Sequence, residues 1–172
     1  MKIALTGTPG TGKTSVSDIL KNKYRVVSLG NFEDARVEYD EERDTFVVDI
    51  EKLKDKVQSL QSDEVIIVEG HYSHDMPVDI VVVLRCNPDV LKHRLEERGY
   101  SKLKILENVE AEAMGLITGE ALAKFPYNKV FEIDTSHKRP EEVAKSIEEI
   151  IEGKGDKYLE RINYMEEILK WY

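Results

Sequence analysis

Cysteine is almost absent from the chain, which has one thiol, Cys86, in 172 residues. A single thiol excludes an internal disulfide and a cysteine-rich zinc site, so nothing in the sequence indicates an oxidising, extracellular setting. Long apolar runs are absent too. No stretch approaches the roughly 20 residues of a membrane-spanning helix, and the amino-terminal MKIALTG is too short for a signal peptide. We therefore expect a soluble, cytoplasmic protein without a membrane partner.

Basic residues are in deficit, because 25 Lys and Arg stand against 34 Asp and Glu, for a formal net charge of -9. This balance argues against wrapping of nucleic acid by the whole surface, although it leaves room for a local basic patch. The length predicts one domain, residues 1–172, that buries roughly two-thirds of the surface its unfolded chain exposes. A self-sufficient core is expected.

Short apolar runs rich in valine and isoleucine recur between longer amphipathic stretches. Near-continuous apolarity predicts strands covered on both faces, and their alternation with helices predicts an α/β three-layer sandwich around a five-stranded parallel sheet. The expected strands are 2–6, 25–29, 65–69, 80–85 and 129–133. The expected helices are 13–21, 50–60, 88–98, 102–122 and 140–151. A last helix over 156–172 would dock its apolar face on the core or on a partner.

The first glycines of the chain stand in GTPGTGKT, residues 7–14, directly after an expected strand. The stretch matches G-x-x-x-x-G-K-[ST], in which glycines let backbone N–H groups turn inward around an anion at a helix N-terminus. Lys13 would reach the β- and γ-phosphates of a nucleotide, and Thr14 would give its hydroxyl to Mg²⁺. A glycine-rich turn without a ligand is the plainer alternative. Strand, helix, lysine and hydroxyl together favour a nucleoside triphosphate site.

A phosphate loop needs a second acidic group on a neighbouring strand, and VIIVE ends in Glu69. Aspartate is usual there, so the longer glutamate favours contact with magnesium through water. The loop that follows, GHYSHD, holds His71, His74 and Asp75. A metal site, a general base or water-positioning group, and a polar loop without chemistry are the alternatives. The two histidines alone are a weak zinc signal, and His71 is the stronger candidate for a catalytic role.

The class of nucleotide enzyme follows from what the rest of the chain lacks. A guanine-specific switch needs Asn-Lys-x-Asp, and the candidate beginning at Asn128 has no aspartate. Large motors need more chain, so small phosphotransferases remain, and these use arginines to hold charge on the transferring phosphoryl group. Arg85 ends a strand, while Arg94 and Arg98 share a helix face. Arg98, just before a glycine, is the favoured candidate; for Arg94 a surface ion pair is equally expected.

Three stretches together carry a resemblance to a known family: LTGTPGTGK, the strand ending in EGH, and VVVLRCNPDVLKHRLEERGYSKLKILENVEAEAM. In this order they resemble the adenylate kinase isoenzyme 6 family, also called the coilin-interacting nuclear ATPase family, with its archaeal members. The pattern LRxxxxxLxxRLxxRGYSxxKxxENxxxE is far more specific than the phosphate loop. The resemblance is weakest over residues 30–64 and after 135.

The resemblance implies a P-loop nucleoside monophosphate kinase fold and transfer of the γ-phosphoryl group of ATP to AMP, with broad substrate tolerance. It also implies ATPase activity and a role in maturing the small ribosomal subunit, through a ribosomal protein partner and in contact with ribosomal RNA. The implied ATP site comprises Gly10, Thr11, Gly12, Lys13, Thr14, Ser15 and Arg98.

Arg98 would open a short lid over about 97–107, and the segment that binds the nucleoside monophosphate would run over about 28–48. Arg36 and Gly30 are the candidates there; a plain surface charge is the alternative for Arg36. The family's aspartate-x-histidine motif becomes Glu69-Gly70-His71, and Tyr72 stands where the family has glycine. Both departures bear on how water would be activated.

Two functions follow. The first is a broad-specificity monophosphate kinase that uses Mg²⁺ with ATP and relies on Lys13, Arg98 and His71. The alternative is an ATPase switch that acts as a ribosome assembly factor, in which an acidic surface or the last helix binds a basic ribosomal protein.

Overall fold

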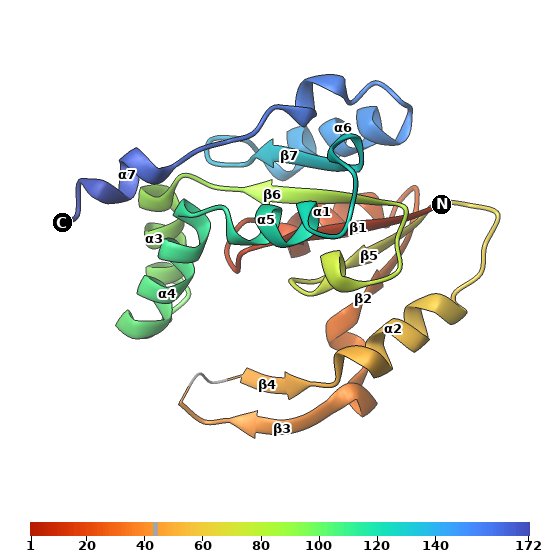
Figure 1. The fold of residues 1–172 in the computed structure, drawn as a ribbon, viewed down its shortest axis with the longest axis horizontal. Helices are drawn as coiled ribbons and strands as arrows, with labels where there is room; N and C mark the ends of the chain where they lie inside the picture. Colours follow the sequence, from red (N-terminus) through yellow and green to blue (C-terminus); the bar gives the residue numbers. More distant parts are fainter. Residues whose placement is uncertain (43–44) are drawn as a thin grey trace.

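The computed structural model describes residues 1–42 and 45–172, and a five-stranded parallel sheet lies at its centre (Figure 1). The strand order is β2-β5-β1-β6-β7. Their bounds are β1 Lys2–Gly7, β2 Arg25–Ser28, β5 Ile66–Glu69, β6 Ile80–Arg85 and β7 Val130–Asp134. The expected α/β sandwich is confirmed, and the expected strands agree closely with the observed ones because each is a nearly continuous apolar run.

Helices cover both faces of the sheet. Alternate residues of β1 point to opposite sides, so Ile3 packs with α1 (Lys13–Leu20) and α6 (Pro140–Ile151) on one face. Ala4 faces α5 (Leu116–Leu122) on the other face. On the same face as Ala4, α2 (Ile50–Ser59) covers β5 through Leu53 and Val57. The three layers place the carboxyl ends of the strands at one edge.

A pair of helices, α3 (Pro88–Glu97) and α4 (Lys102–Ala113), extends beyond that edge (Figure 1). Side-chain caps fix where both begin: Asn87 accepts a hydrogen bond from the backbone of Asp89, and Ser101 accepts one from that of Lys104. Their shared core also takes in Ile168 of the short helix α7 (Met165–Leu169).

Two helix predictions are wrong. The expected helix 102–122 is broken at Gly115, whose φ of 62° ends α4 and starts α5 as a separate helix. The expected helix 156–172 is instead a 3₁₀ turn, Asp156–Leu159, then irregular backbone, then α7. The backbone of Ile162 bonds to buried side chains of the sheet, Arg85 and Glu132, in place of helical partners.

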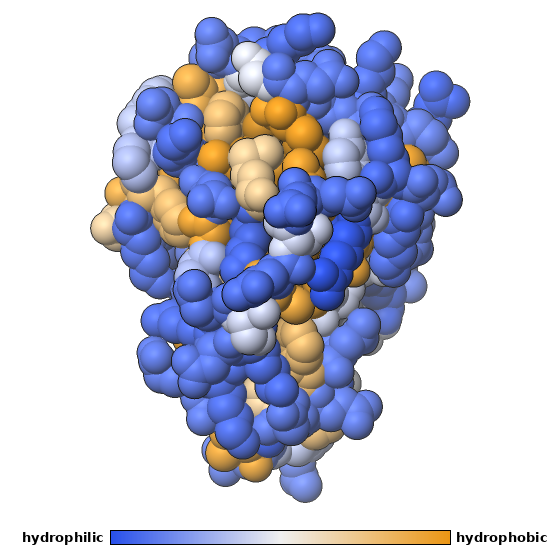
Figure 2. All heavy atoms as spheres, turned by 90° about the vertical axis from the view of Figure 1, so that its right-hand side faces the viewer, coloured by the Kyte–Doolittle hydropathy of each residue, from blue (hydrophilic) through white to orange (hydrophobic). Residues whose placement is uncertain are grey.

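A two-stranded hairpin stands apart from the main sheet (Figure 1). Strand β3 (Arg36–Asp40) pairs antiparallel with β4 (Thr45–Val48), within the segment expected to bind a monophosphate. Residues 43 and 44 of that segment lie outside the described residues. Apolar side chains, among them Val37 and Val47, are exposed on the hairpin. Figure 2 shows apolar groups at the lower end of the face it draws and a broader apolar area in the upper half, with hydrophilic side chains around both.

The remaining short elements are 3₁₀ turns at Leu29–Asn31, Glu33–Ala35, Ser73–Asp75 and Tyr127–Lys129. Across residues 1–42 and 45–172, every helix is too short or too polar to traverse a lipid bilayer.

Candidate functional site

The GTPGTGKT loop joins the carboxyl end of β1 to the start of α1, as its sequence predicts. Its backbone turns back on itself, and Thr11 donates from both its N–H and its hydroxyl to the carbonyl oxygen of Thr8, at 3.2 and 2.8 Å. Gly10 has a φ of +90°, and a Cβ there would meet Leu91 at 2.8 Å. A glycine at this position therefore lets the loop lie directly on α3.

Lys13 points back into the loop and is buried. Its Nζ donates to the carbonyl oxygens of Gly7, at 2.6 Å, and Thr8, at 3.2 Å. Burial lowers its pKa to about 8; Glu69 acts in the opposite direction and Arg98 adds to the lowering. The two partners of the Lys13 ammonium are neutral carbonyl oxygens, and a bound phosphate group would be an anionic partner for it.

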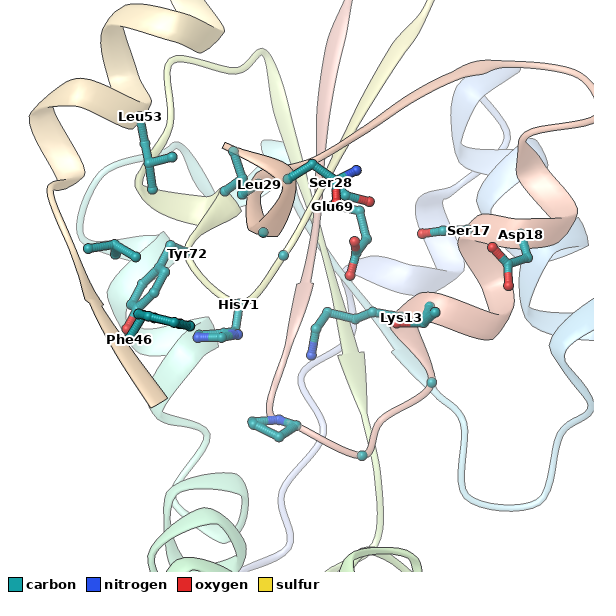
Figure 3. A pocket seen from close by; sticks show the side chains of 18 of the residues that line it. Lys13, Ser17, Asp18, Ser28, Leu29, Phe46, Leu53, Glu69, His71 and Tyr72 are labelled. Carbon is teal, nitrogen blue, oxygen red and sulfur yellow. The ribbon is translucent and has the colours of Figure 1, made fainter. Parts of the chain in front are cut away.

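The loop forms one wall of a pocket of about 550 Å³. The other walls come from the segment after β2, the hairpin, the end of β5 and the turn after α3. In Figure 3 the side chains of Lys13, Glu69 and His71 converge on the pocket, with Phe46 and Tyr72 farther along it. Predicted residues that line it are Gly10, Gly12, Lys13, Thr14, Gly30, Arg36, Glu69, His71 and Arg98.

A smaller pocket of about 190 Å³ lies on the far side of the loop, where the two other predicted ATP residues, Thr11 and Ser15, are found. Arg94 crosses this region and donates to the carbonyl oxygens of Gly10, at 3.2 Å, and Thr135, at 2.8 Å. The expectation that Arg94 forms a surface ion pair is therefore wrong, because its guanidinium joins the phosphate loop to the segment after β7.

Sequence reasoning did not include Thr135 or Lys138, which line the smaller pocket. The Thr135 hydroxyl donates to the carbonyl oxygen of Thr11 at 2.9 Å. A usable signal was present, because the polar segment TSHKR follows directly on β7 at the same edge of the sheet.

His71 lies beside Lys13 at the mouth of the larger pocket (Figure 3). The residue is exposed to solvent on one side; desolvation by the pocket walls on the other is the main cause that lowers its pKa to about 4, and the charge of Lys13 acts in the same direction. The imidazole is therefore neutral near pH 7 and can accept a proton or a hydrogen bond. Tyr72 packs against it with ring centroids 4.4 Å apart.

His74 has a different place, since it is buried behind the site. Its Nδ1 lies 2.9 Å from the Thr6 hydroxyl and its Nε2 lies 2.7 Å from a carboxylate oxygen of Glu120. Both ring nitrogens therefore have partners, and the residue joins β1 to α5. Asp75 pairs with Lys124.

Arg36 projects from the start of β3 into the larger pocket. It donates to the carbonyl oxygen of Gly30 at 3.0 Å, and its guanidinium lies 4.4 Å from the ring centroid of Phe46. The two residues predicted for the monophosphate segment are thus in direct contact. A guanidinium has five N–H donors, so one that bonds to Gly30 through Nη2 can still donate to an anion.

Arg85 does not line either pocket. It is buried between Glu112 and Glu132, so it is not placed to hold charge on a phosphoryl group. Arg98, by contrast, ends α3 with an exposed side chain and lines both pockets.

The residues that would hold magnesium are Thr14 and Glu69, both in the lining of the larger pocket. A hydroxyl and a carboxylate are hard oxygen donors of the kind magnesium prefers, so this pair fits the ion. Among residues 1–42 and 45–172, no group of three or more histidine, cysteine or acidic side chains is placed to hold a metal by protein ligands alone.

The fold and the loop define a P-loop nucleotide-binding domain. Residues 3–115 match the family model described as "AAA domain". The chain is 38% identical over 163 residues to a Methanocaldococcus jannaschii protein named "Putative adenylate kinase", with 91% of this chain and 89% of the relative covered. A Pyrococcus abyssi protein of the same name is 44% identical over 149 residues, covering 86% and 82%. The chain belongs to the family of these archaeal kinases, within the P-loop nucleoside monophosphate kinase superfamily.

Solved structures show the same fold. A shikimate kinase from Bacteroides thetaiotaomicron superposes with a TM-score of 0.56 at 18% identity, covering 88% of this chain and 98% of that one. A deoxyadenosine kinase from M. mycoides gives a TM-score of 0.53 at 17% identity, covering 89% and 99%. The more specific resemblance to the adenylate kinase isoenzyme 6 family stays a prediction.

Proposed function

We propose that this kinase has broad specificity and transfers the γ-phosphoryl group of ATP to AMP or to other nucleoside monophosphates. One observation carries the proposal: a single pocket has the phosphate loop with Lys13 on one wall and Arg36 on the hairpin wall. Two cationic side chains on separate walls suit two phosphorylated substrates that meet in between.

On the ATP side, the loop N–H groups would bind the phosphates and the positive end of α1 would add attraction. Lys13 would leave the carbonyl oxygens of Gly7 and Thr8 and pair with the β- and γ-phosphates. Arg98, at the junction of both pockets, would stabilise negative charge on the transferring group. The smaller pocket, with Arg94 and Lys138, would hold the remainder of the nucleotide.

On the acceptor side, Arg36 would bind the monophosphate and hold its oxygen in line with the γ-phosphorus. Thr14 and Glu69 would hold magnesium, which when bound supplies charge neutralisation between the phosphates. His71, neutral near pH 7, would donate a hydrogen bond from its ring N–H to the attacking phosphate group. Apart from this hydrogen bond, positioning and charge stabilisation account for catalysis, as is general for phosphoryl transfer.

Product analysis tests the proposal. The chain is incubated with Mg-ATP alone and then with AMP, CMP, GMP or UMP, and ADP and nucleoside diphosphates are quantified. We expect AMP to accelerate ADP formation strongly and to yield two ADP per ATP consumed. If none of the four monophosphates increases ADP formation, the kinase function is wrong.

A second function, an ATPase switch in ribosome assembly, is favoured by the shortness of the connection after α3. Only residues 98–101 separate α3 from α4, so little chain is available to cover the phosphates and exclude water. The net charge of -9 would suit a basic ribosomal protein of the small subunit, with ribosomal RNA nearby, in the cytoplasm. Under this function, a basic ribosomal protein would change the rate of ATP hydrolysis and AMP would not.

A further inference from the structure

A buried ionic network lies between β6, β7 and α4. Its central residues are Arg85, Glu112 and Glu132, whose exposed fractions are 1%, 3% and 2%. Arg85 donates from Nε to Glu112 at 2.9 Å and from Nη1 to Glu132. Arg161 lies 4.0 Å from Glu132, so two arginines balance two glutamates. Buried charges persist only when paired and hydrogen-bonded in this way.

Every oxygen of the Glu112 carboxylate has a donor. Oε2 accepts from Arg85 and, at 2.8 Å, from the backbone N–H of Cys86. Oε1 accepts at 2.9 Å from the hydroxyl of Thr8, the second residue of the phosphate loop. The network thus reaches the loop through one hydroxyl group.

Within the phosphate loop, Thr8 accepts the hydrogen bonds that hold the turn together. Its carbonyl oxygen accepts from the backbone and side chain of Thr11 and from Nζ of Lys13. Its side chain is buried and lines neither pocket. Any effect of the Thr8 hydroxyl on nucleotide binding must therefore pass through the position of the loop.

We propose that Glu112 is a positioning residue for the phosphate loop, acting on Thr11 and Lys13 through the hydroxyl of Thr8. The proposal rests on the proposed function, because it assigns a role in binding ATP. A carboxylate fixed by a guanidinium is a rigid acceptor, so it holds the Thr8 peptide in the orientation that presents its carbonyl oxygen to Lys13. The same contact would keep the loop N–H groups aimed at the phosphates before ATP arrives.

The network offers a matched pair of substitutions. Thr8→Val removes the hydroxyl that donates to Glu112, and Thr118→Val removes the hydroxyl that donates to Glu132 at 2.7 Å. Both hydroxyls are buried, both bind a carboxylate of the same network, and valine keeps the shape of threonine. Only Thr8 belongs to the phosphate loop. Comparing the two variants therefore distinguishes an effect on the position of the loop from an effect on the stability of the fold.

We measure the ATP dissociation constant, kcat, KM for each substrate and thermal unfolding. We expect Thr8→Val to lower kcat/KM for ATP about tenfold, the effect of losing one hydrogen bond to a charged group. KM for AMP should stay within about twofold, because the hairpin wall is untouched. Thr118→Val should lower the unfolding midpoint comparably and leave kcat/KM for ATP within about twofold of the unmodified chain. Thr8→Ser, which keeps the hydroxyl, should restore activity.

Glu112→Gln and the double variant Thr8→Val with Glu112→Gln complete a cycle. If Glu112 acts through Thr8, the double variant should bind ATP no more weakly than the weaker of the two single variants. Additive losses, or equal losses of ATP affinity in Thr8→Val and Thr118→Val, would overturn the proposal. If Glu112→Gln fails to fold, the comparison of Thr8→Val with Thr118→Val still tests the proposal.

The proposed function can fail separately. If the unmodified chain phosphorylates no monophosphate, the proposed kinase function is wrong. The ATP dissociation constants of Thr8→Val and Thr118→Val can still be compared, so the positioning role is tested separately. If the chain turns over and these two variants are alike, the kinase function stands and the positioning role of Glu112 is wrong.

Discussion

The two walls of the larger pocket differ in how firmly they are held. In the phosphate loop that forms one wall, Thr8, Thr11 and Lys13 are buried, and the loop is tied to α3, to the segment after β7 and to the buried network. On the hairpin wall, Arg36 and Val37 are exposed, and 67% of Val37 remains accessible.

Among the described residues, two polar contacts lie at the base of the hairpin. The backbone N–H of Asp49 donates to the carbonyl oxygen of Ala35 at 2.7 Å, and Lys56 pairs with Asp34 on the surface at 2.7 Å. Few buried apolar contacts and many exposed backbone groups mark a segment of low local stability. Under the proposed function, we expect the loop wall to be prepared for ATP before binding and the hairpin wall to close over the acceptor and exclude water.

The largest effect should come from the fixed wall. Lys13→Met removes the ammonium aimed at the β- and γ-phosphates, and we expect turnover to fall about 10²- to 10³-fold, as for other lost transition-state donors. Coupled assays of ADP formation measure it, with circular dichroism as the check on folding. Lys145→Met, an exposed lysine of α6, is the matched control and should keep full activity. If Lys13→Met kept its turnover, the assignment of the phosphate loop as the ATP site would be wrong.

A smaller effect is expected from the hairpin wall. Arg36→Ala should lower kcat/KM for AMP by about 10- to 100-fold, since it removes a charge-assisted contact to the monophosphate. The ATP dissociation constant should not change. Arg25→Ala, an exposed arginine at the start of β2, controls for loss of surface charge. Equal loss of ATP and AMP affinity in Arg36→Ala would show that the two walls do not act separately.

The pH dependence of ATP binding sharpens the contrast. Because burial holds the pKa of Lys13 near 8 and a bound phosphate favours the charged form, binding takes up a proton above that pH. We expect the ATP dissociation constant to rise as pH increases through 8, by at most about tenfold per pH unit. Isothermal titration between pH 7 and 9.5 measures this, and Lys13→Met should lack the slope. The same slope in both proteins would assign it to another group.

The smallest effect concerns the aromatic support of Arg36. Phe46→Leu removes the ring beneath the guanidinium, and we expect KM for AMP to rise about two- to fivefold, as fits an exposed cation–π contact. Tyr39→Leu alters the aromatic partner of Phe46 without reaching the pocket and should leave KM unchanged. If both variants raise KM equally, the hairpin acts as a unit and the Arg36–Phe46 contact has no separate role.

The sequence predicted the sheet and the phosphate loop well because their signals are local. Buried parallel strands are continuous apolar runs, and the loop needs its glycines, lysine and hydroxyl at fixed spacing. The hairpin was missed for a physical reason: β3 and β4 expose side chains on both faces, so neither shows the apolar alternation of a half-buried strand.

Long-range contacts account for the other errors. The periodicity of 156–172 suits a helix, but the N–H and C=O groups of Ile162 bind Glu132 and Arg85, which lie 30 and 77 residues away along the chain. Arg85 likewise resembles a phosphate ligand in sequence, and only the fold places two glutamates around it. The contact of Thr8 with Glu112 spans 104 residues and leaves no local pattern.

Ile162 also sets an order of events during synthesis. Arg85, Glu112 and Glu132 all emerge from the ribosome before the peptide group that bonds to two of them. Until that peptide arrives, Glu132 has an acceptor oxygen without its backbone donor, and buried groups in that condition are costly. The phosphate loop is made long before Ile162, yet the network behind it is complete only when the polypeptide has passed Ile162.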